Sequence, residues 1–588
     1  MKKFGIKIAT LLSTLLIALT FVGCEFFTTP QKPSLPKKLD APKVAVSYTG
    51  LAVWSADEYA LYYEYVIDEG QETPTSECSV QLELGQSIRV KTISGLDGCD
   101  DSDYSSAVTY QSSTPYEHEH TDVNSDNLCD ICGNSLSVEL SFFAINDLHG
   151  KFMDTDAQPG VDELTTYIKE LYADPAREEI LLASGDMWQG TVESSTNRGQ
   201  LMTDWMNELG FVSMTLGNHE YDWGADVLMP NSVQANFPFL GINVRQNGEI
   251  AQYCQPSTIV EKSGLKIGII GAIGDCLSSI SGEYTNGLYF ATDDILTSLV
   301  KSEAKRLKEE EDCDFIVYSI HDGGSGFSNS GVTSVTNKDM PWYDSSLSDG
   351  YIDLVFEAHT HQRYILQDEY GVYHLQGGGE NSAISSALVS YNTATGEFSV
   401  KPSLISNGVY ANSSITGDDI VEDLFKEYFP TENPYTTVLG TNRSWRSSSD
   451  IADMVAGLYY EKGVETWGME YDIVLGGGYL KTRNPYDLGP GNVTYADLFS
   501  ILPFDNAIVL GSIEGKYLKS QFLKGRDNYH VHSKVSSSDV SDKQIYYIVV
   551  DSYTSTYYYN HITEIARLNE KVYARDLLAD FIRVGGWA

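Results

Sequence analysis

The sequence predicts a multidomain protein whose main part is an α/β domain and whose N-terminal part is a small all-β module. The first observation is the length, because 588 residues are more than one hydrophobic core usually organises. The second is a change of pattern along the chain. Apolar and polar residues alternate with period two in residues 41–115, whereas apolar runs alternate with helical patterns from residue 137 onward.

The N-terminus has the composition of a signal peptide. An apolar run follows two lysines and ends in the residues FVGC, which resemble a bacterial lipobox with Phe where Leu is usual. We therefore expect a leader over residues 1–23 and lipidation of Cys24, which would anchor the protein in a membrane outside the cytoplasm as a surface lipoprotein. An uncleaved anchor helix is the alternative. The proline-rich residues 24–40 are predicted to form a linker.

Residues 41–115 are predicted to form a small β-sandwich. Their strand-like stretches are separated by turn residues, and Trp54 is the expected core aromatic. Cys78 and Cys99 flank the second strand-like stretch and could pair as a disulfide outside the cytoplasm. The pattern resembles fibronectin type III-like surface modules, which implies either a spacer or a carbohydrate-type adhesion unit.

Residues 116–136 contain many side chains that can bind metals. Four of them have the His-x-His and Cys-x-x-Cys spacing of a small zinc site: His118, His120, Cys129 and Cys132. Four others occupy positions one, three, five and nine of a calcium loop: Asp122, Asn124, Asp126 and Asp130. Position twelve of that loop is Gly133 instead of Glu, which weakens the calcium interpretation. The segment is therefore either a mini-module with a metal site or a linker with a Cys129–Cys132 disulfide.

From residue 137 onward, five apolar runs each end in polar side chains that can bind metals. In chain order these are Asp147 and His149, Asp186, Asn218 and His219, His321, and His359 and His361. Helical patterns lie between the runs, for example around Leu296 and Leu307. Because open α/β sheets place their sites at the carboxyl ends of strands, we expect these residues to meet.

The residue types predict the cofactor. With His219 set aside, two Asp, one Asn and four His offer the nitrogen and oxygen ligands that suit Mn, Zn, Fe or Co. Seven ligands are too many for one ion, but two ions about 3.5 to 4 Å apart that share a carboxylate would use all of them. Such ions would also attract a phosphate, which the net charge of −43 otherwise repels. The same charge argues against nucleic acid as a partner.

The motifs D-x-H, G-D, G-N-H-E, H and H-T-H, in this order, resemble those of the calcineurin-like metallophosphoesterases. GDMWQG and GNHEYDWG are similar to the 5'-nucleotidase family within that group. The resemblance implies an α/β metallophosphoesterase sandwich over residues 137–410, a linker helix over 411–432 and an α+β substrate-binding domain over 433–588.

The resemblance also implies roles for the polar residues. One metal ion would be held by Asp147, His149, Asp186 and His361, and the other by Asp186, Asn218, His321 and His359. Asp186 would bridge the two ions. His219 and Asp222 would form a catalytic dyad, in which the imidazole meets the phosphoryl or leaving oxygen and the carboxylate orients it.

The stretch NVTYADLFSILPFDN resembles the family's substrate-binding domain, with Phe504 as a candidate pocket residue. Two substrate-binding elements of the family are absent: an Arg after the glycines and a GGDGY-like element. Arg483 and Tyr553 are the candidate replacements, as an anion contact and as a base-stacking aromatic. A surface arginine and a structural tyrosine are the alternative.

The sequence thus predicts an extracytoplasmic metal-dependent phosphohydrolase that releases phosphate from nucleotides. One alternative is a hydrolase of another phosphoester or pyrophosphate, such as a nucleotide sugar or a cyclic nucleotide. Another is a non-catalytic surface binding protein. The complete ligand set argues against the last alternative, because a scaffold that binds no metal does not need all seven residues.

Overall fold

The computed structural model describes residues 36–586 apart from several short segments. The omitted positions are 97, 112–119, 125, 127, 155–158, 174–177, 277–278, 281–283, 286, 330, 337–338, 340–349, 412–415, 480–486, 525–528, 558–559 and 569–571. The predicted leader, Cys24, His118 and Arg483 therefore lie outside the described residues. None of the helices in the described part has the length and apolar character that crossing a membrane requires.

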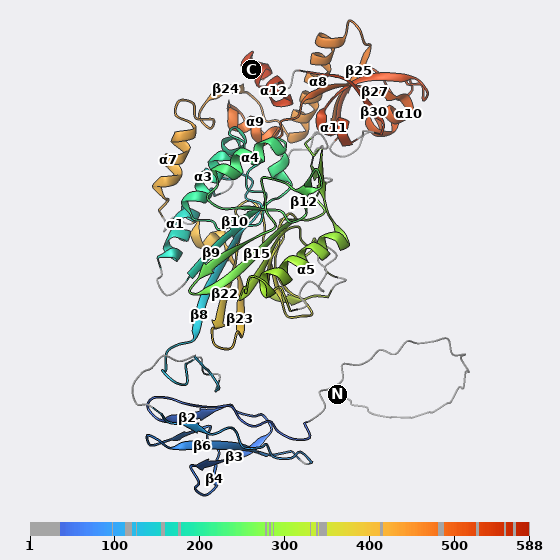
Figure 1. Cartoon of the computed structure of the whole chain (residues 1–588). Helices are drawn as coiled ribbons and strands as arrows, with labels where there is room; N and C mark the ends of the chain where they lie inside the picture. The colour runs from blue at the N-terminus through green and yellow to red at the C-terminus, as the bar shows by residue number, and fades with distance from the viewer. Residues whose placement is uncertain are drawn as a thin grey trace, which may run out of the picture. The chain divides into compact units, whose positions relative to one another are not determined.

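The chain divides into two compact units, Met1–Ser135 and Leu136–Ala588 (Figure 1). The first unit is all-β in its described part. One sheet contains β1 (Val44–Val46), β2 (Leu51–Trp54) and β5 (Ser79–Gln81), and the other contains β4 (Thr73–Thr75), β3 (Ala60–Ile67), β6 (Ser87–Ser94) and β7 (Val108–Thr109). All the pairings are antiparallel.

A small hydrophobic cluster holds this β-module together. Trp54 is fully buried in it and meets Tyr63 edge to face, with 5.9 Å between the ring centroids, so the predicted core aromatic is confirmed. The possible Cys78–Cys99 disulfide is not found, because both thiols are free. Cys78 packs against the cluster, whereas the Cys99 thiol lies 3.6 Å from the carbonyl oxygen of Asp100. The two side chains thus have separate partners.

The second unit contains two large sheets. The first has the order β11 (Phe239–Leu240), β10 (Ser213–Thr215), β9 (Glu178–Ala183), β8 (Ser137–Ile145), β22 (Ala383–Asn392) and β23 (Phe398–Ser406). The second has the order β14 (Ser257–Lys262), β15 (Leu265–Ile273), β17 (Phe315–His321), β19 (Leu354–Phe356), β21 (Tyr373–Gly377), β20 (Arg363–Gln367) and β18 (Val332–Ser334). A third, small sheet joins β13 (Glu249–Ile250), β12 (Val244–Gln246) and β16 (Leu288–Phe290).

The two large sheets pack face to face. A buried cluster joins β8, β9 and β22 of the first sheet to β15, β17 and β19 of the second, and Phe142 stacks on Phe315 with 5.5 Å between the ring centroids. Strands β8 to β11 run parallel, as do β15, β17 and β19. Parallel strands that are buried on both faces are nearly continuous apolar runs, and this is the pattern from which they were predicted.

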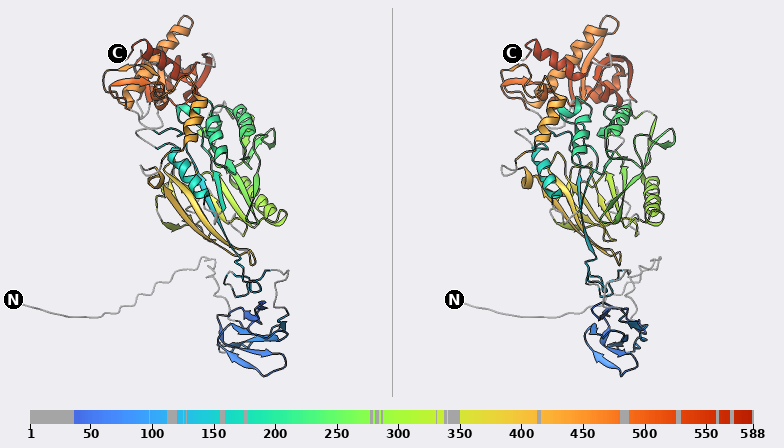
Figure 2. Two further views of the ribbon diagram at one scale, coloured as in Figure 1. Left: turned by 90° about the vertical axis from the view of Figure 1, so that its left-hand side faces the viewer. Right: turned by 60° about the vertical axis from the view of Figure 1, so that its left-hand side comes forward.

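Helices cover the outer faces of both sheets (Figure 2). Over the first sheet lie α1 (Asp162–Tyr172), α2 (Val192–Ser195), α3 (Gln200–Glu208), α4 (Ala225–Gln234), α6 (Asn407–Tyr410) and α7 (Asp419–Tyr428). Helix α5 (Asp293–Glu309) covers the second sheet and buries Leu296 and Leu307, as its helical pattern predicts. Helix α7 lies within the range predicted as a linker helix.

The C-terminal part of this unit is α+β. Its main sheet has the order β28 (Tyr529–Ser533), β25 (Ile473–Tyr479), β29 (Ile545–Asp551), β27 (Ile508–Glu514) and β30 (Ile562–Arg567), and β24 (Val438–Asn442) pairs with β26 (Gly491–Thr494). The helices are α8 (Ser448–Trp467), α9 (Tyr495–Ile501), α10 (Gly515–Tyr517), α11 (Ser552–Tyr557) and α12 (Ala574–Arg583), with a π-turn over Leu518–Leu523. The predicted fold class is confirmed, and the domain boundaries inside the unit stay a prediction.

Candidate metal centre

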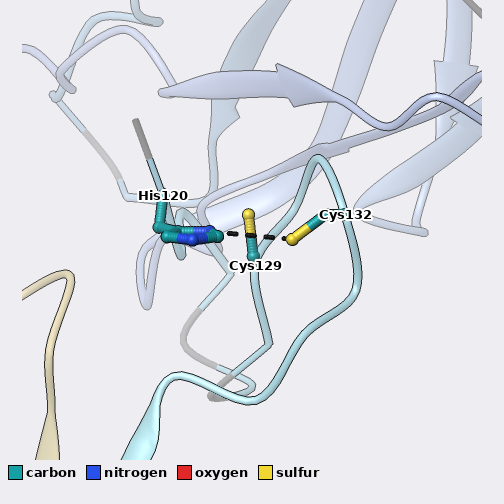
Figure 3. A group of neighbouring side chains, drawn as sticks. All are labelled: His120, Cys129 and Cys132. Carbon is teal, nitrogen blue, oxygen red and sulfur yellow. Dashed lines mark hydrogen bonds between the residues drawn. The ribbon is translucent and has the colours of Figure 1, made fainter. Parts of the chain in front are cut away.

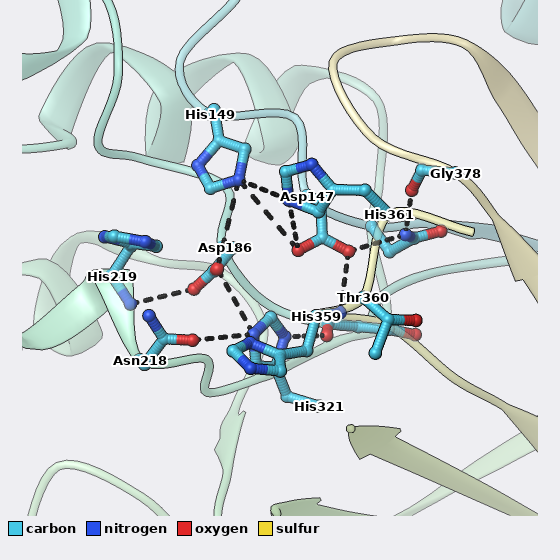
Figure 4. A network of polar contacts seen from close by, with 12 residues as sticks. Asp147, His149, Asp186, Asn218, His219, His321, His359, Thr360, His361 and Gly378 are labelled. Atoms are coloured by element: carbon cyan, nitrogen blue, oxygen red, sulfur yellow. Dashed lines mark hydrogen bonds and ion pairs between the residues drawn. The ribbon is translucent and has the colours of Figure 1, made fainter. Parts of the chain in front are cut away.

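The polar residues predicted as ligands follow strands of both large sheets. Asp147 and His149 follow β8, Asp186 follows β9, Asn218 follows β10, His321 ends β17, and His359 and His361 follow β19. Because parallel strands bring their carboxyl ends to one edge of a sheet, these side chains converge between the two sheets, as Figure 4 shows. Most of the set is buried, and His361 is its exposed member.

One cluster of donor atoms consists of Asp147, His149 and His361, whose ligand atoms lie within 4.8 Å of one another. Nε2 of His361 is 3.3 Å from Oδ1 of Asp147 and 3.0 Å from Nε2 of His149. Oδ1 of Asp147 is buried and accepts no hydrogen bond. A carboxylate oxygen facing two imidazole nitrogens is an arrangement that a divalent cation would satisfy.

A second cluster lies beside the first and includes Asp186, Asn218 and His321. Nε2 of His321 is 3.2 Å from Oδ2 of Asp186 and 3.2 Å from Oδ1 of Asn218. The ring of His359 follows at 5.3 Å from the His321 ring, between centroids. The Oδ2 atom of Asp186 that faces His321 is also 4.0 Å from Nε2 of His149, so Asp186 lies between the two clusters.

Backbone carbonyl groups set the tautomers of two histidines. Nδ1 of His149 lies 3.0 Å from the carbonyl oxygen of Gln189, and Nδ1 of His321 lies 2.8 Å from that of Ser184. A carbonyl oxygen can only accept, so each Nδ1 carries the proton and donates it. In a neutral ring the Nε2 atom then offers a lone pair to the site, which is the arrangement that metal-binding histidines need.

The electrostatics of the second cluster favour added positive charge. Burial raises the pKa of Asp186, but the imidazoles of His321, His219 and His149 more than offset this and hold it well below its usual range. Burial lowers the pKa of His321, but the Asp186 carboxylate more than offsets this and raises it to about 10. The site thus attracts a cation, and a divalent ion would replace the proton that His321 otherwise holds.

Backbone conformation at the site is unusual. Five of the predicted ligands have positive φ angles between 50° and 68°: Asp147, His149, Asp186, His359 and His361. Residues other than glycine rarely adopt this conformation, and they do so mostly where function requires it. The strain therefore marks the same residues that the motifs indicate.

Glu220 supports the site in a way that the sequence alone does not indicate. Its buried carboxylate accepts hydrogen bonds from the backbone N–H groups of Asp186, Met187 and Gly217, at 2.7 to 2.9 Å. It thereby ties the loop after β9 to the loop after β10. Gly217 is needed for this close approach, because a Cβ atom there would lie 2.4 Å from Oδ1 of Asp186. The only sequence signal was the Glu of the GNHE motif.

The predicted dyad of His219 and Asp222 lies at the edge of the two clusters. Nδ1 of His219 is 2.7 Å from Oδ2 of Asp222, and the backbone N–H of His219 donates to Oδ1 of Asp186 at 2.8 Å. The two side chains are 15% and 13% exposed. His219 is therefore open to a substrate in a way that the buried His321 is not. A ring nitrogen of His219 also lies within 4.8 Å of ligand atoms of His149 and Asp186.

The C-terminal part of the second unit contacts the residues around the His219–Asp222 dyad. The ring of Phe504 lies 6.2 Å from the His219 ring, between centroids, with an interplanar angle of 22°. The side chain of Gln189 donates to the carbonyl oxygen of Pro503 at 3.0 Å, and Tyr435 donates to Glu193 at 2.7 Å. Contacts between residues more than two hundred positions apart thus build one wall of the site.

Arg575 of α12 holds the loop that carries Phe504. Its buried guanidinium donates to the carbonyl oxygen of Leu502 at 2.8 Å, forms an ion pair with Asp505 and lies 3.6 Å from the centroid of the Phe499 ring. Tyr553, the predicted stacking aromatic, is half-buried in α11. Its role stays a prediction, as does that of Arg483, which lies outside the described residues.

Two family models match the chain. One, described as calcineurin-like phosphoesterase, matches residues 140–363, and the other, 5'-nucleotidase C-terminal domain, matches residues 430–565. An apyrase from Tabanus yao is 26% identical over 422 residues, which is 65% of this chain and 72% of that protein. A 5'-nucleotidase from Vibrio cholerae is 23% identical over 431 residues, 65% of this chain and 74% of that protein. A snake venom 5'-nucleotidase from Gloydius brevicauda is 39% identical over 150 residues, 23% of this chain and 25% of that protein.

Solved structures show the same architecture. A 5'-nucleotidase precursor from Thermus thermophilus superposes with a TM-score of 0.55 at 16% identity, covering 76% of this chain and 96% of that one. A sulfate thiohydrolase from the same species reaches 0.52 at 16% identity, covering 76% of this chain and 94% of that one. At these identities the likeness concerns the fold.

The two matched models follow each other along the chain. The first, over residues 140–363, contains the strand-end motifs, and the second, over residues 430–565, lies in the α+β part. The chain belongs to the 5'-nucleotidase family of calcineurin-like metallophosphoesterases, a family of phosphohydrolases.

Proposed function

We propose that the protein is a dinuclear metal-dependent phosphohydrolase that releases phosphate from nucleotides outside the cytoplasm. The observation that carries this proposal is the convergence of seven nitrogen- and oxygen-bearing side chains from five strand ends, with Asp186 between the two clusters. The family gives the protein's class, a phosphohydrolase. The substrate and the number of bound metal ions are parts of the proposal.

The residues present fit two metal ions. Asp147, His149 and His361 would hold one ion, and Asn218, His321 and His359 would hold the other, with Asp186 shared. The buried Oδ1 atom of Asp147 that accepts no hydrogen bond and the two Nε2 lone pairs defined by backbone carbonyl groups support this assignment. The donor set contains nitrogen and oxygen only, which suits Mn, Zn, Fe or Co. When bound, two such ions would clamp a phosphoryl group and supply a water nucleophile near neutral pH.

The chain's own proton chemistry is assigned to His219. With Nδ1 held by Asp222 at 2.7 Å, the opposite nitrogen, Nε2, is oriented for the substrate. A protonated Nε2 can donate to the leaving oxygen, and the Asp222 carboxylate stabilises the charged imidazole until it does. Neither role requires His219 to bind metal.

A nucleotide is the substrate that the surroundings of the dyad favour. Phe504 lies nearly parallel to the His219 ring at 6.2 Å, and aromatic side chains of this kind stack on nucleobases. The names of the relatives, apyrase and 5'-nucleotidase, support the same substrate class. The missing family elements, an Arg and a GGDGY-like stretch, are the reason to keep other phosphoesters as an outcome of the test.

We also infer that the protein acts at a bacterial cell surface. The N-terminal composition and the FVGC ending support a cleaved leader and a lipid anchor on Cys24. Mass spectrometry of the mature protein should find a diacylglyceryl-modified Cys24 at the N-terminus. A chain that begins at Met1 would contradict this inference.

A phosphate-release screen tests the substrate. Nucleoside mono-, di- and triphosphates, nucleotide sugars, cyclic nucleotides and a small chromogenic phosphoester would be compared at equal concentration, with metal analysis of the same sample. We expect the largest kcat/KM for a nucleotide. Good turnover of another phosphoester without nucleotide hydrolysis would reject the nucleotide assignment and leave the metal chemistry intact.

Replacing Phe504 by Ala should weaken nucleotide binding selectively. Because stacking on a base contributes about 1 to 3 kcal/mol, we expect KM for a nucleotide to rise about 5- to 150-fold, with little change for the small chromogenic ester. Tyr553→Ala is the matched comparison, since Tyr553 is the other candidate aromatic. Equal effects of Phe504→Ala on both substrates would contradict a stacking role for Phe504.

A further inference from the structure

A second group of metal-binding side chains lies in the N-terminal unit, in residues 120–135. Both family models begin after this segment. Its chain reverses between Leu128 and Ser135, which form an antiparallel bridge, and Gly133 makes the turn with a φ of 72°. The backbone N–H of Gly133 donates to the carbonyl oxygen of Cys129 at 2.7 Å. This turn carries the Cys-x-x-Cys pair.

Three side chains converge beside the turn (Figure 3). The ligand atoms of His120, Cys129 and Cys132 all lie within 4.8 Å of one another, and Nδ1 of His120 is 3.6 Å from the Cys132 sulfur. Two ligands at about 2.3 Å (sulfur) and about 2.0 Å (nitrogen) from one tetrahedral ion lie about 3.6 Å apart. The observed separation is therefore the one that a zinc-type ion requires.

The thiols are available as ligands. No disulfide joins Cys129 and Cys132 in the structure, so the alternative of a Cys129–Cys132 disulfide is not found. A thiolate is the form of cysteine that binds metals.

The segment has almost no apolar core of its own. Between positions 120 and 135, the buried residues of the described part are Asp122, Cys129 and Asp130. None of these three belongs to the hydrophobic cluster around Trp54. Short segments that cannot bury apolar surface commonly depend on a bound metal for their fold.

The calcium interpretation fits the contacts less well. The carboxylates of the proposed calcium loop accept hydrogen bonds from nearby backbone N–H groups: Asp122 from Asp126, Asp126 from Leu128 and Asp130 from Val123, at 2.8 to 3.0 Å. They stabilise the approach to the turn. The groups that can hold a metal in the described part of the chain include His120, Cys129 and Cys132 but none of these carboxylates.

We propose that His120, Cys129 and Cys132 bind Zn²⁺, or a cation of similar size and softness, and that this ion stabilises the turn between Leu128 and Ser135. Three ligands leave one position of a tetrahedral ion, which water or a further side chain would fill. The site is chemically distinct from the catalytic centre, because two of its three ligands are thiols, whereas beside the catalytic centre the buried Cys276 thiol lies within 4.8 Å of ligand atoms of His321 and His359.

Cobalt absorption tests the proposal on the full chain. Metal-stripped, thiol-reduced protein would be titrated with Co²⁺ and then with Zn²⁺. Thiolate ligands give Co²⁺ a charge-transfer band in the near ultraviolet, which nitrogen and oxygen ligands do not, and a Cys276→Ala background removes the thiol that lies near His321 and His359. We expect the band to saturate at about one Co²⁺ per chain for this site and to disappear when Zn²⁺ replaces Co²⁺.

Variants separate this site from other thiols and from folding defects. Cys132→Ala should abolish the band and leave phosphate release unchanged, whereas Cys78→Ala, the matched control in the same unit, should keep the band. Cys132→His should keep the ion with a weaker band. The proposal would be overturned by the absence of the band in reduced wild-type protein, by its persistence in a Cys129→Ala/Cys132→Ala double variant, or by native protein that carries a Cys129–Cys132 disulfide and no zinc.

Discussion

Asp186→Asn should deprive the protein of both metal and activity. The Oδ2 atom of Asp186 faces His321 at 3.2 Å and His149 at 4.0 Å, so one carboxylate serves both clusters. An uncharged amide cannot hold two divalent ions close together. Changes in residues that only support metal ligands reduce affinity about 10- to 100-fold, so we expect a shared ligand to cost more than about 100-fold. Phosphate release should fall in parallel.

Asp186→Asn is chosen because it should leave the local fold intact. An Asn at position 186 can still accept the hydrogen bond from the His219 backbone, and Glu220 would still tie the two loops together. Asp423→Asn is the matched control, because Asp423 is 72% exposed on α7. Unchanged metal content and turnover in Asp186→Asn would refute the shared-ligand assignment.

His219→Ala should separate catalysis from metal binding. The clusters contain enough ligands for two ions without His219, so metal content should stay at the wild-type level. Loss of an acid–base group typically lowers turnover about 10² to 10⁴-fold. The loss should be larger for a nucleotide, whose leaving alcohol needs a proton, than for a chromogenic ester with an acidic leaving group.

Two further variants sharpen this result. Residues that act as one unit are not additive, so Asp222→Ala should add little in the His219→Ala background. His532→Ala, an exposed histidine on β28, should have no effect and controls for the substitution itself. Loss of metal in His219→Ala would instead identify His219 as a ligand. The closeness of His219 to His149 and Asp186 is the reason to measure the metal content.

The core of the site was predictable because local signals define it. Apolar runs reveal strands, and the residues after Ile145 or Ala183 must then appear at a strand end. In parallel sheets these ends share an edge, so sequence order alone brings Asp147 and Asp186 together. The positive φ angles at these positions could not be predicted from residue type, because they result from the loops that the strand ends impose.

Local sequence patterns could not predict the contacts that support the site. Glu220 acts through three backbone N–H groups of two loops, and Arg575 supports Leu502, 73 positions earlier. The GNHE motif contains Glu220 but does not show which groups it contacts, and Arg575 belongs to no motif, since each contact depends on how distant segments pack. The sequence left the Cys78–Cys99 pairing open for a related reason. Sequence spacing gives no distance between two thiols, and a disulfide requires a specific geometry.

The central claim is that phosphate release depends on two metal ions held by the strand-end residues. Its most direct test is to strip the Cys129→Ala/Cys132→Ala variant, which lacks the thiol ligands of the proposed N-terminal site, of metal and to follow nucleotide hydrolysis during stepwise addition of Mn²⁺ or Zn²⁺. We predict that activity appears only as about two ions bind per chain. Full activity with a single bound ion, or with none, would contradict the claim.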